Sequence, residues 1–273
     1  MKAADSAIRT FWAEDDPVPV VARAVDYPSG HRIPPHRHDR GQLVYASAGV
    51  MTVITAAGTW VVPPQRALWV PAGTEHEVRA TGRLAMRTLY LRPEAVPWLP
   101  EACRVVAVPP LLRELILRTT ALARLDDPDG RGGRLVAVIL DELRQLATAP
   151  LHLPMPEDPR LRRVARALAD HPADARTLAA WAREAGASPR TLTRRFQAET
   201  GMSFRHWQRQ ARLLAALVRL AEGRSVTDVA LDLGYDSPSA FIAMFRRALG
   251  TTPGRYFDDA GAHGADGGAG SAG

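Results

Sequence analysis

Several features that would place a chain in other protein classes are scarce or missing here. The 273 residues include a single cysteine, Cys103, so an intramolecular disulfide is excluded, as suits a reducing compartment. No apolar run approaches the ~20 residues that a membrane-spanning helix needs. The N-terminus also lacks the basic, apolar and small-residue succession of a signal peptide. These absences predict a soluble, cytoplasmic protein with no membrane association.

Positive charge is unevenly divided along the chain, and Lys2 is its only lysine. Residues 1–157 carry 18 Lys and Arg against 17 Asp and Glu, a net charge of +1. Residues 158–257 carry 17 Arg against 9 Asp and Glu, a net charge of +8. The length and the 46% hydrophobic content suit two domains with separate cores. The basic C-terminal half therefore favours a nucleic-acid partner.

Residues 177–257 contain one pattern twice. Three apolar or glycine positions recur 48 residues later, and six more recur 49 residues later, so one unit is repeated with a single insertion. The first group is Leu178, Ala182 and Gly186, matched by Val226, Ala230 and Gly234. The second is Ser188, Pro189, Phe196, Gly201, Ser203 and Trp207, matched by Ser237, Pro238, Phe245, Gly250, Thr252 and Tyr256.

Each copy has the residues that begin and end helices in a helix-turn-helix unit. In the first copy, Thr177 caps a helix, Gly186 ends it, and Ser188-Pro189 begins the next. In the second copy, Ser225 to Asp228 form a capping box and Gly234 is the stop. The sequence therefore predicts two helix-turn-helix motifs.

A helix predicted between the copies has a length that matters for DNA. Residues 203–222 carry an apolar face, and about 20 residues span roughly 30 Å. Successive major-groove faces of a duplex lie ~34 Å apart. Such a spacer lets two recognition helices enter adjacent major-groove segments from one side of the duplex.

Residues 158–257 resemble the DNA-binding domain of the AraC/XylS transcription regulators, and residues 230–253 resemble that family's signature. The resemblance covers a little over a third of the chain. It implies double-stranded promoter DNA as a partner, a homodimer, and contact with RNA polymerase in an activator. It also implies DNA contacts from Arg190, Thr193 and Arg194 in the first motif, and from Ser239, Ile242 and Ala243 in the second. We expect Arg195, Arg246 and Arg247 to meet the backbone and the first motif to read most of the bases.

The N-terminal part has short apolar runs rich in β-branched residues and broken by Pro and Gly. They predict an all-β domain, a sandwich or small barrel. The predicted strands are 20–25, 43–46, 50–55, 59–62, 67–70, 76–80 and 86–91.

Histidines mark the chemistry of this domain. The spacing of Gly30, His36, His38, Gln42 and Gly49 follows the first cupin motif, and residues 71–76 follow the core of the second. The domain therefore resembles a cupin, a small β-barrel that serves as the sensor of many such regulators. It departs from the metal-binding cupins because Gln42 stands where they usually have Glu, and Gln65 stands where the second motif opens with Gly.

Two readings of this cluster remain open. His36 and His38 lie two residues apart, so both point to one face of a strand, and with His76 and Gln42 they provide four donors for a divalent metal. Otherwise they are polar residues of a small-molecule pocket at the barrel mouth, lined also by Tyr45, Trp60 and Trp69.

The remaining segments complete an α+β, two-domain organisation. We expect a cupin-like sensor barrel at 1–92, helices at 109–125 and 134–148 within a packing or dimerisation segment at 93–148, and a Pro-rich linker at 149–157. An all-α double helix-turn-helix domain follows at 158–257, with a disordered Gly/Ala-rich tail at 258–273.

These expectations predict a sequence-specific transcription regulator, activator or repressor, controlled by a small molecule or metal in the cupin domain and not itself an enzyme. The alternative is a metal-dependent cupin enzyme fused to a DNA-binding module. Gln42 argues against that alternative, and so does the lack of a general acid or base beside the histidines other than Glu75 and Glu77.

Overall fold

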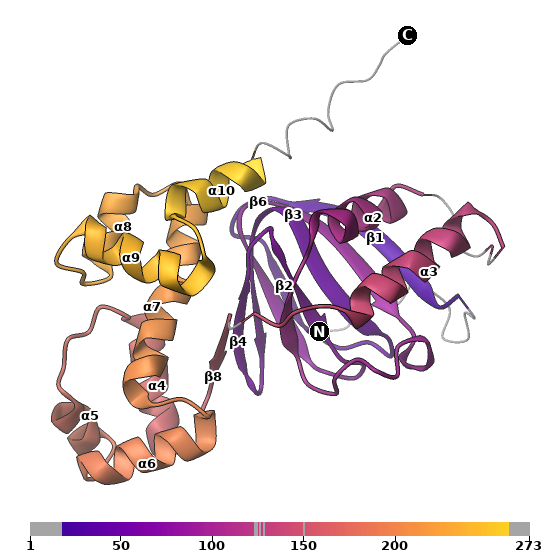
Figure 1. Ribbon diagram of the computed structural model, residues 1–273. Helices are drawn as coiled ribbons and strands as arrows, with labels where there is room; N and C mark the ends of the chain where they lie inside the picture. Colours follow the sequence, from indigo (N-terminus) through magenta and orange to yellow (C-terminus); the bar gives the residue numbers. More distant parts are fainter. Residues whose placement is uncertain (1–17, 123–124, 126, 128, 150, 262–273) are drawn as a thin grey trace. The chain divides into compact units, whose positions relative to one another are not determined.

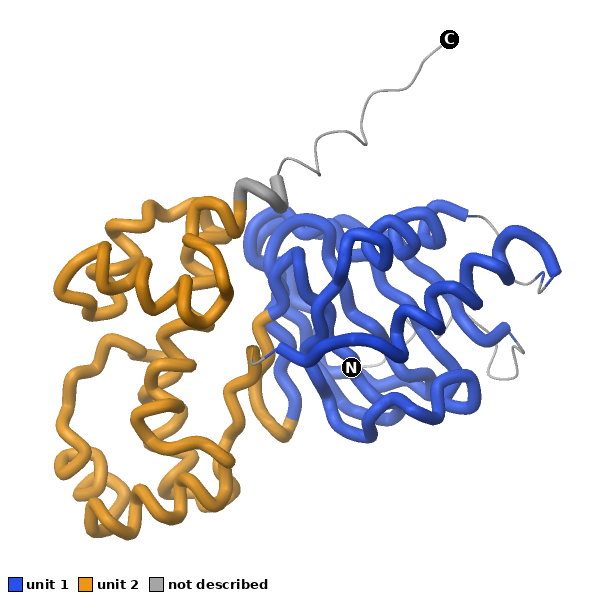
Figure 2. The backbone as a smooth tube through the Cα atoms, viewed as in Figure 1, with its two compact units in different colours: residues 1–55, 62–150, 266–273 blue, residues 56–61, 151–265 orange. Residues whose placement is uncertain are grey.

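The computed structural model describes residues 18–122, 125, 127, 129–149 and 151–261. These residues divide into two compact units, coloured separately in Figure 2. The first unit holds the described residues of 1–55 and 62–150, and the second holds those of 56–61 and 151–265. A short piece of the N-terminal half, residues 56–61, therefore belongs with the C-terminal unit.

An antiparallel sheet forms the first unit, drawn in indigo to magenta in Figure 1. Its central strand β6 pairs with β1, β2 and β3, while β5 pairs with β3 and β7 pairs with β5. The strands are β1 (Val20–Tyr27), β2 (Arg32–His36), β3 (Gly41–Thr55), β5 (Arg66–Val70), β6 (His76–Leu91) and β7 (Arg104–Ala107). The predicted cupin-like, sheet-rich domain is confirmed.

Two long strands each join two of the predicted ones. β3 joins the predicted strands 43–46 and 50–55, and β6 joins 76–80 and 86–91. The pairing of β3 with β6 shifts register between Ala46 and Val50, and Gly49 takes a φ of 77° there. Such a bulge absorbs the extra residues, so one strand continues through what looks like a turn.

β2 and β7 lie outside the predicted set. β2 contains Pro34 and Pro35, which lack an N–H donor, and among the described residues it pairs with β6 alone, with a register shift between Ile33 and His36. Proline is tolerated at such an edge. β7 has four residues and pairs with β5, a long-range pairing that the sequence does not reveal.

Two helices, α2 (Pro110–Thr120) and α3 (Arg131–Arg144), cover one face of the sheet (Figure 1). A short 3₁₀ turn, η1 (Pro93–Ala95), precedes them. Their apolar stripes join the strand residues in one buried core, with Leu112, Ile116, Val136, Ile139 and Leu143 from the helices. The stripes thus pack on the sheet, while Leu111 and Val138 remain 54% and 43% exposed.

The second unit begins with a strand pair. β8 (His152–Pro154) pairs antiparallel with β4 (Gly58–Val62), and the rings of His152 and Trp60 stack with centroids 4.3 Å apart. Part of the segment 149–157, predicted as a linker, is therefore ordered as a strand. The three prolines of 149–157 favour a linker over a strand in the sequence, because proline lacks the N–H group that strand pairing uses.

Helices make up the rest of this unit, and the predicted N-cap residues are in place. They are α4 (Pro159–Asp170), α5 (Leu178–Glu184), α6 (Pro189–Thr200), α7 (Phe204–Ala221), α8 (Val226–Asp232), α9 (Pro238–Leu249) and α10 (Pro253–Gly261). Thr177, Ser188, Ser225 and Ser237 each accept a backbone N–H as N-caps. Two helix-turn-helix motifs, α5–α6 and α8–α9, are joined by the 18-residue α7. Of the predicted tail, 258–261 fall in α10 and 262–273 lie outside the described residues.

Among the residues described, no helix is both long enough and apolar enough to cross a membrane.

Candidate DNA-binding and effector sites

The first recognition helix, α6, has a buried face and an exposed face. Leu192 and Phe196 are fully buried, whereas Arg190 and Arg194 are exposed. Thr193 is half-buried, and its hydroxyl donates to the Pro189 carbonyl at 2.9 Å. The outward positions therefore carry guanidinium groups, which bind guanine edges and phosphates in a major groove.

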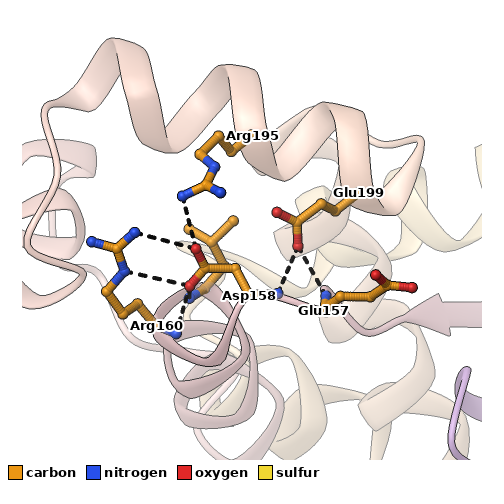
Figure 3. A network of polar contacts seen from close by, with 6 residues as sticks. Glu157, Asp158, Arg160, Arg195 and Glu199 are labelled. Atoms are coloured by element: carbon orange, nitrogen blue, oxygen red, sulfur yellow. Dashed lines mark hydrogen bonds and ion pairs between the residues drawn. The ribbon is translucent and has the colours of Figure 1, made fainter.

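Arg195 lies apart from the other predicted DNA-contacting residues of α6. Its Nη1 donates to Oδ2 of Asp158, at the beginning of α4, over 2.8 Å (Figure 3). The residue is half-buried and ion-paired. Its phosphate contact stays a prediction, but the structure directs the side chain toward α4.

The second recognition helix, α9, presents its predicted DNA face as a shallow hollow. Phe241 and Phe245 are fully buried in the core. An open depression of about 600 Å³ is lined by Ser239, Ile242, Ala243, Arg246, Arg247 and Thr252. All five predicted residues thus share one concave surface. Thr252 also lines this hollow, but it is not among the residues predicted from the sequence to contact DNA. Its repeat counterpart, Ser203, caps α7 and marks a helix start.

The three histidines of the sensor unit come together as predicted. His36 and His76 are opposite one another in the β2–β6 pair, with ring centroids 4.3 Å apart, and His38 lies 5.2 Å from His76. One ring nitrogen from each of the three lies within 4.8 Å of the others. His76 is only 1% exposed. The cluster is thus a compact group of nitrogen donors on strands β2 and β6 and the β2–β3 turn. The expectation that His36 and His38 share one strand is wrong for His38, because β2 ends at His36.

The backbone fixes the orientation of each ring. Nδ1 lies 2.8 Å from the Pro34 carbonyl oxygen in His36, 2.6 Å from that of Arg40 in His38, and 2.9 Å from that of Thr74 in His76. Because a carbonyl only accepts, each Nδ1 carries the proton and donates. In its neutral form, such a ring has its lone pair on Nε2, as in metal-ligating histidines whose other nitrogen is held by an outer partner.

Gln42 completes the cluster. Its Oε1 lies 3.0 Å from Nε2 of His38 and 3.1 Å from Nε2 of His76. Burial lowers the pKa of His38 and, with the neighbouring His36, lowers the pKa of His76 to about 3, so both rings are neutral at pH 7. Two nitrogen lone pairs therefore face an amide oxygen with no proton between them. A bound cation would remove this conflict.

The three predicted aromatic pocket residues lie elsewhere, which corrects that part of the prediction. Leu43 pairs with Trp69 and Tyr45 with Ala67 across β3 and β5, whereas Gln42 pairs with Val70. Since side chains alternate along a strand, Tyr45 and Trp69 point to the opposite face from Gln42, into the core beneath α2 and α3. Trp60 stacks on His152 in the other unit.

Trp69 nevertheless lines cavities on that opposite face. One of about 310 Å³ is bordered by Trp69, Val96 and several prolines, and another of about 150 Å³ by Trp69, Trp98 and Leu143. Arg104 and Arg144 border the smaller one, and the Arg144 guanidinium lies 4.0 Å from the Trp98 ring centre. The walls are largely apolar.

Of the two carboxylates that flank His76, Glu77 is held by arginines and Glu75 is exposed. Both Arg32 and Arg79 bond the Glu77 carboxylate at 2.6 Å. Burial raises the pKa of Glu77, but these two guanidiniums outweigh it and hold that pKa below its usual range. Glu75 is exposed. Glu77 therefore serves as an ion-pair partner of the adjacent arginines.

Comparison with known proteins identifies a ligand-binding domain and a helix-turn-helix domain in the two parts of the chain described above. Residues 18–129 match an AraC-like ligand binding domain, and residues 181–259 match a helix-turn-helix domain. The transcriptional regulator NimR of Escherichia coli is 40% identical over 223 residues, 82% of this chain and 81% of NimR. The arabinose operon regulatory protein of Escherichia coli is 28% identical over 133 residues, 47% of this chain and 46% of that protein.

Among solved structures, the DNA-binding domain of AdpA, in complex with a target DNA, is 33% identical; the match covers 40% of this chain and 98% of that domain, with a TM-score of 0.37. The extent of the match to NimR, together with both domain matches, establishes the relationship. The chain belongs to the AraC family of transcription regulators, as a DNA-binding regulator with a ligand-binding domain and not as an enzyme.

Proposed function

We propose that this protein controls transcription by binding promoter DNA through both helix-turn-helix motifs, with the occupancy of the cupin-like unit setting how they bind. The observation that carries the proposal is the pair of motifs, α5–α6 and α8–α9, joined by an 18-residue helix of about 27 Å. That length approaches the ~34 Å repeat of the major groove. The +8 charge of residues 158–257 supplies attraction for phosphates.

The two recognition helices divide the work in this proposal. α6 presents Arg190 and Arg194, which can bridge guanine O6 and N7. α9 presents Ile242 and Ala243, which offer only apolar contact to a thymine methyl, beside Arg246 and Arg247 near the backbone. The first motif therefore carries most of the base readout, while the second mainly anchors.

The effector we propose for the histidine cluster is a divalent first-row metal ion. The donor set fits such an ion, because His36, His38 and His76 are each oriented by a backbone carbonyl and the Gln42 oxygen faces two of them. A bound metal would supply a cross-link between β2, β3 and β6. Occupancy would then stabilise the sensor unit, and stabilisation of one conformation is what couples a ligand to an output.

A metal content measurement tests this assignment. Protein purified without an affinity tag is analysed by mass spectrometry for bound metal, and DNA binding is measured with and without a chelator. Stoichiometric metal that is lost in His76→Ala but retained in His31→Ala supports the proposal. His31 is a matched control because it stacks on Tyr27 and lies outside the cluster.

A second candidate effector is a small organic molecule. The observation that favours it is the pair of apolar cavities lined by Trp69 on the helix-covered face of the sheet. Protein that is metal-free and still binds DNA would support this candidate, and Trp69→Ala would then abolish the thermal shift that a ligand produces. In that case the Gln42 amide would be turned over, so that its NH₂ donates to both imidazoles and the Thr88 hydroxyl donates to the Gln42 oxygen instead of to the Leu43 carbonyl.

We also propose that the protein acts as a cytoplasmic homodimer, and that it contacts RNA polymerase if it activates transcription. Leu111 on α2 and Val138 on α3 are exposed apolar residues on the helices that cover the sheet. Light scattering coupled to size-exclusion chromatography tests the dimer. A monomer at micromolar concentration, or a dimer unchanged by Leu111→Glu with Val138→Glu, would count against this surface.

A further inference from the structure

We infer that Asp158, Arg195 and Glu199 position the recognition helix α6, and that Arg195 serves as a positioning residue in place of a phosphate contact. The inference rests on the proposed role of α6 as the main base-reading helix. Figure 3 shows the three side chains between α6 and the chain that enters α4.

Two side chains one turn apart on α6 hold the same short segment. The Glu199 carboxylate oxygen Oε2 accepts the backbone N–H groups of Glu157 and Asp158, both at 2.9 Å. One turn earlier, Arg195 donates to the Asp158 carboxylate at 2.8 Å. A helix held at two points four residues apart cannot roll about its axis without breaking one of these bonds.

Asp158 has a second task that fixes it in place. Its Oδ1 accepts the backbone N–H groups of Arg160 at 2.8 Å and Leu161 at 3.4 Å, which makes it the N-cap of α4. Its side chain is only 10% exposed, compared with 41% for Arg195. The carboxylate therefore offers Arg195 a rigid partner, which lowers the entropic cost of holding the arginine.

The segment before Asp158 is also bound to α7 and α4, the helices that flank the first motif in sequence. The Trp207 indole N–H, from α7, donates to the Pro154 carbonyl at 2.7 Å, and Arg162 donates to the Pro156 carbonyl at 2.8 Å. Pro154 ends β8, which pairs with β4. The orientation of α6 is thus tied to the segment 154–158, which follows the sensor in sequence.

The second motif lacks these contacts, which argues that they are particular to α6. Shifted by the 49-residue repeat, Arg195 corresponds to Met244 and Glu199 to Ala248, neither of which can form an ion pair. Arg190 and Arg194 are exposed on α6. Of the two recognition helices, α6 is therefore the one whose orientation these contacts fix, and its base reading depends on that orientation.

Asp158→Asn is the decisive variant because asparagine caps a helix as well as aspartate does but carries no charge for Arg195. It is compared with Arg195→Gln and with the double variant, all in the full-length protein, on duplexes selected with the wild-type protein. We expect each single change to reduce discrimination at the base pairs under α6 about tenfold, with no change under α9. The double variant should lose no more than either single one, as coupled residues do.

Salt dependence separates positioning from phosphate contact. Removing a phosphate contact lowers the salt slope by about 1, so positioning predicts an unchanged slope in Arg195→Gln. A slope lowered by about 1 with base preference intact would overturn the inference. Tighter, more salt-dependent binding by Asp158→Asn would also overturn it, by showing that Asp158 withholds Arg195 from DNA. Arg194→Ala tests the underlying assignment separately, since an unchanged base preference there would refute base reading by α6.

Discussion

The Gln42 amide nitrogen donates to the hydroxyl of Thr88 at 3.0 Å, and that hydroxyl donates to the Leu43 carbonyl at 3.0 Å. Because the Thr88 hydroxyl donates its one proton to the Leu43 carbonyl, its oxygen can only accept a hydrogen bond from Gln42. This bond aims the Gln42 oxygen at His38 and His76. Thr88, on β6, thus determines whether Gln42 presents its oxygen or its NH₂ group to the histidines.

Gln42→Glu should therefore strengthen metal binding. A carboxylate at this position adds a charged oxygen donor to the three imidazoles, so we expect at least about tenfold tighter binding of a divalent ion. Competition with a chelator of known affinity measures the change, and His31→Ala should leave it unaltered. If neither the wild type nor Gln42→Glu binds metal at stoichiometric level, the cluster is a polar pocket.

Two glycines of the first cupin motif should respond differently to alanine. Gly30 has a φ of +80° and open space around it, so Gly30→Ala should cost only about 1 kcal/mol from the left-handed backbone. A Cβ on Gly49, with a φ of +77°, would lie 2.7 Å from the Arg83 carbonyl oxygen. Gly49→Ala should therefore cost at least about 1 kcal/mol more. Chemical unfolding of the two variants gives the comparison, and equal losses would contradict it.

Arg194→Ala and Arg246→Ala should separate base readout from anchoring. Arg194 is exposed on α6, and its loss should relax base preference and cost about 1–3 kcal/mol on the best site. Arg246 borders the α9 hollow, and its loss should weaken all sites alike and lower the salt slope by about 1. The measurement is binding to a panel of duplexes at several salt concentrations. A larger change of base preference in Arg246→Ala would reverse the assignment.

Acid should weaken the C-terminal unit partly through Asp158. The Arg160 side chain, together with backbone N–H donors, holds the pKa of Asp158 at about 2, below its value in an unfolded chain near 3.9. Its stabilising contribution is therefore complete above about pH 4 and is lost as the pH falls toward 2. In Asp158→Asn this part of the pH dependence should be missing. Unfolding curves between pH 2.5 and 5 provide the test, and identical pH profiles would contradict it.

The sequence predicts best what is local. Caps such as Ser188 and Ser225 bond N–H groups three residues away, so their residue types suffice to place the helix starts. The repeat of residues 177–257 likewise places both helix-turn-helix motifs. His36, His38 and His76 come together as the cupin resemblance implies, although His38 lies in the β2–β3 turn and not on a strand.

What the sequence does not predict depends on pairing between distant segments. The face that Tyr45 and Trp69 occupy follows from the register of β3 against β5, which no local pattern gives. The partner of Arg195 lies 37 residues away, and β8 becomes a strand only by pairing with β4. An exposed arginine and a bonded one look alike in a sequence, so positioning and DNA-contacting roles need the structure to tell them apart.

The most direct test of the account is selection of binding sites from random duplexes by the full-length protein, followed by hydroxyl-radical footprinting on the winners. Two recognition helices joined by α7 predict two sequence blocks about one helical turn apart, protected on one side of the duplex. The block under α6 should be the more sharply defined. A single block, or protection without sequence enrichment, would contradict the paired-motif account.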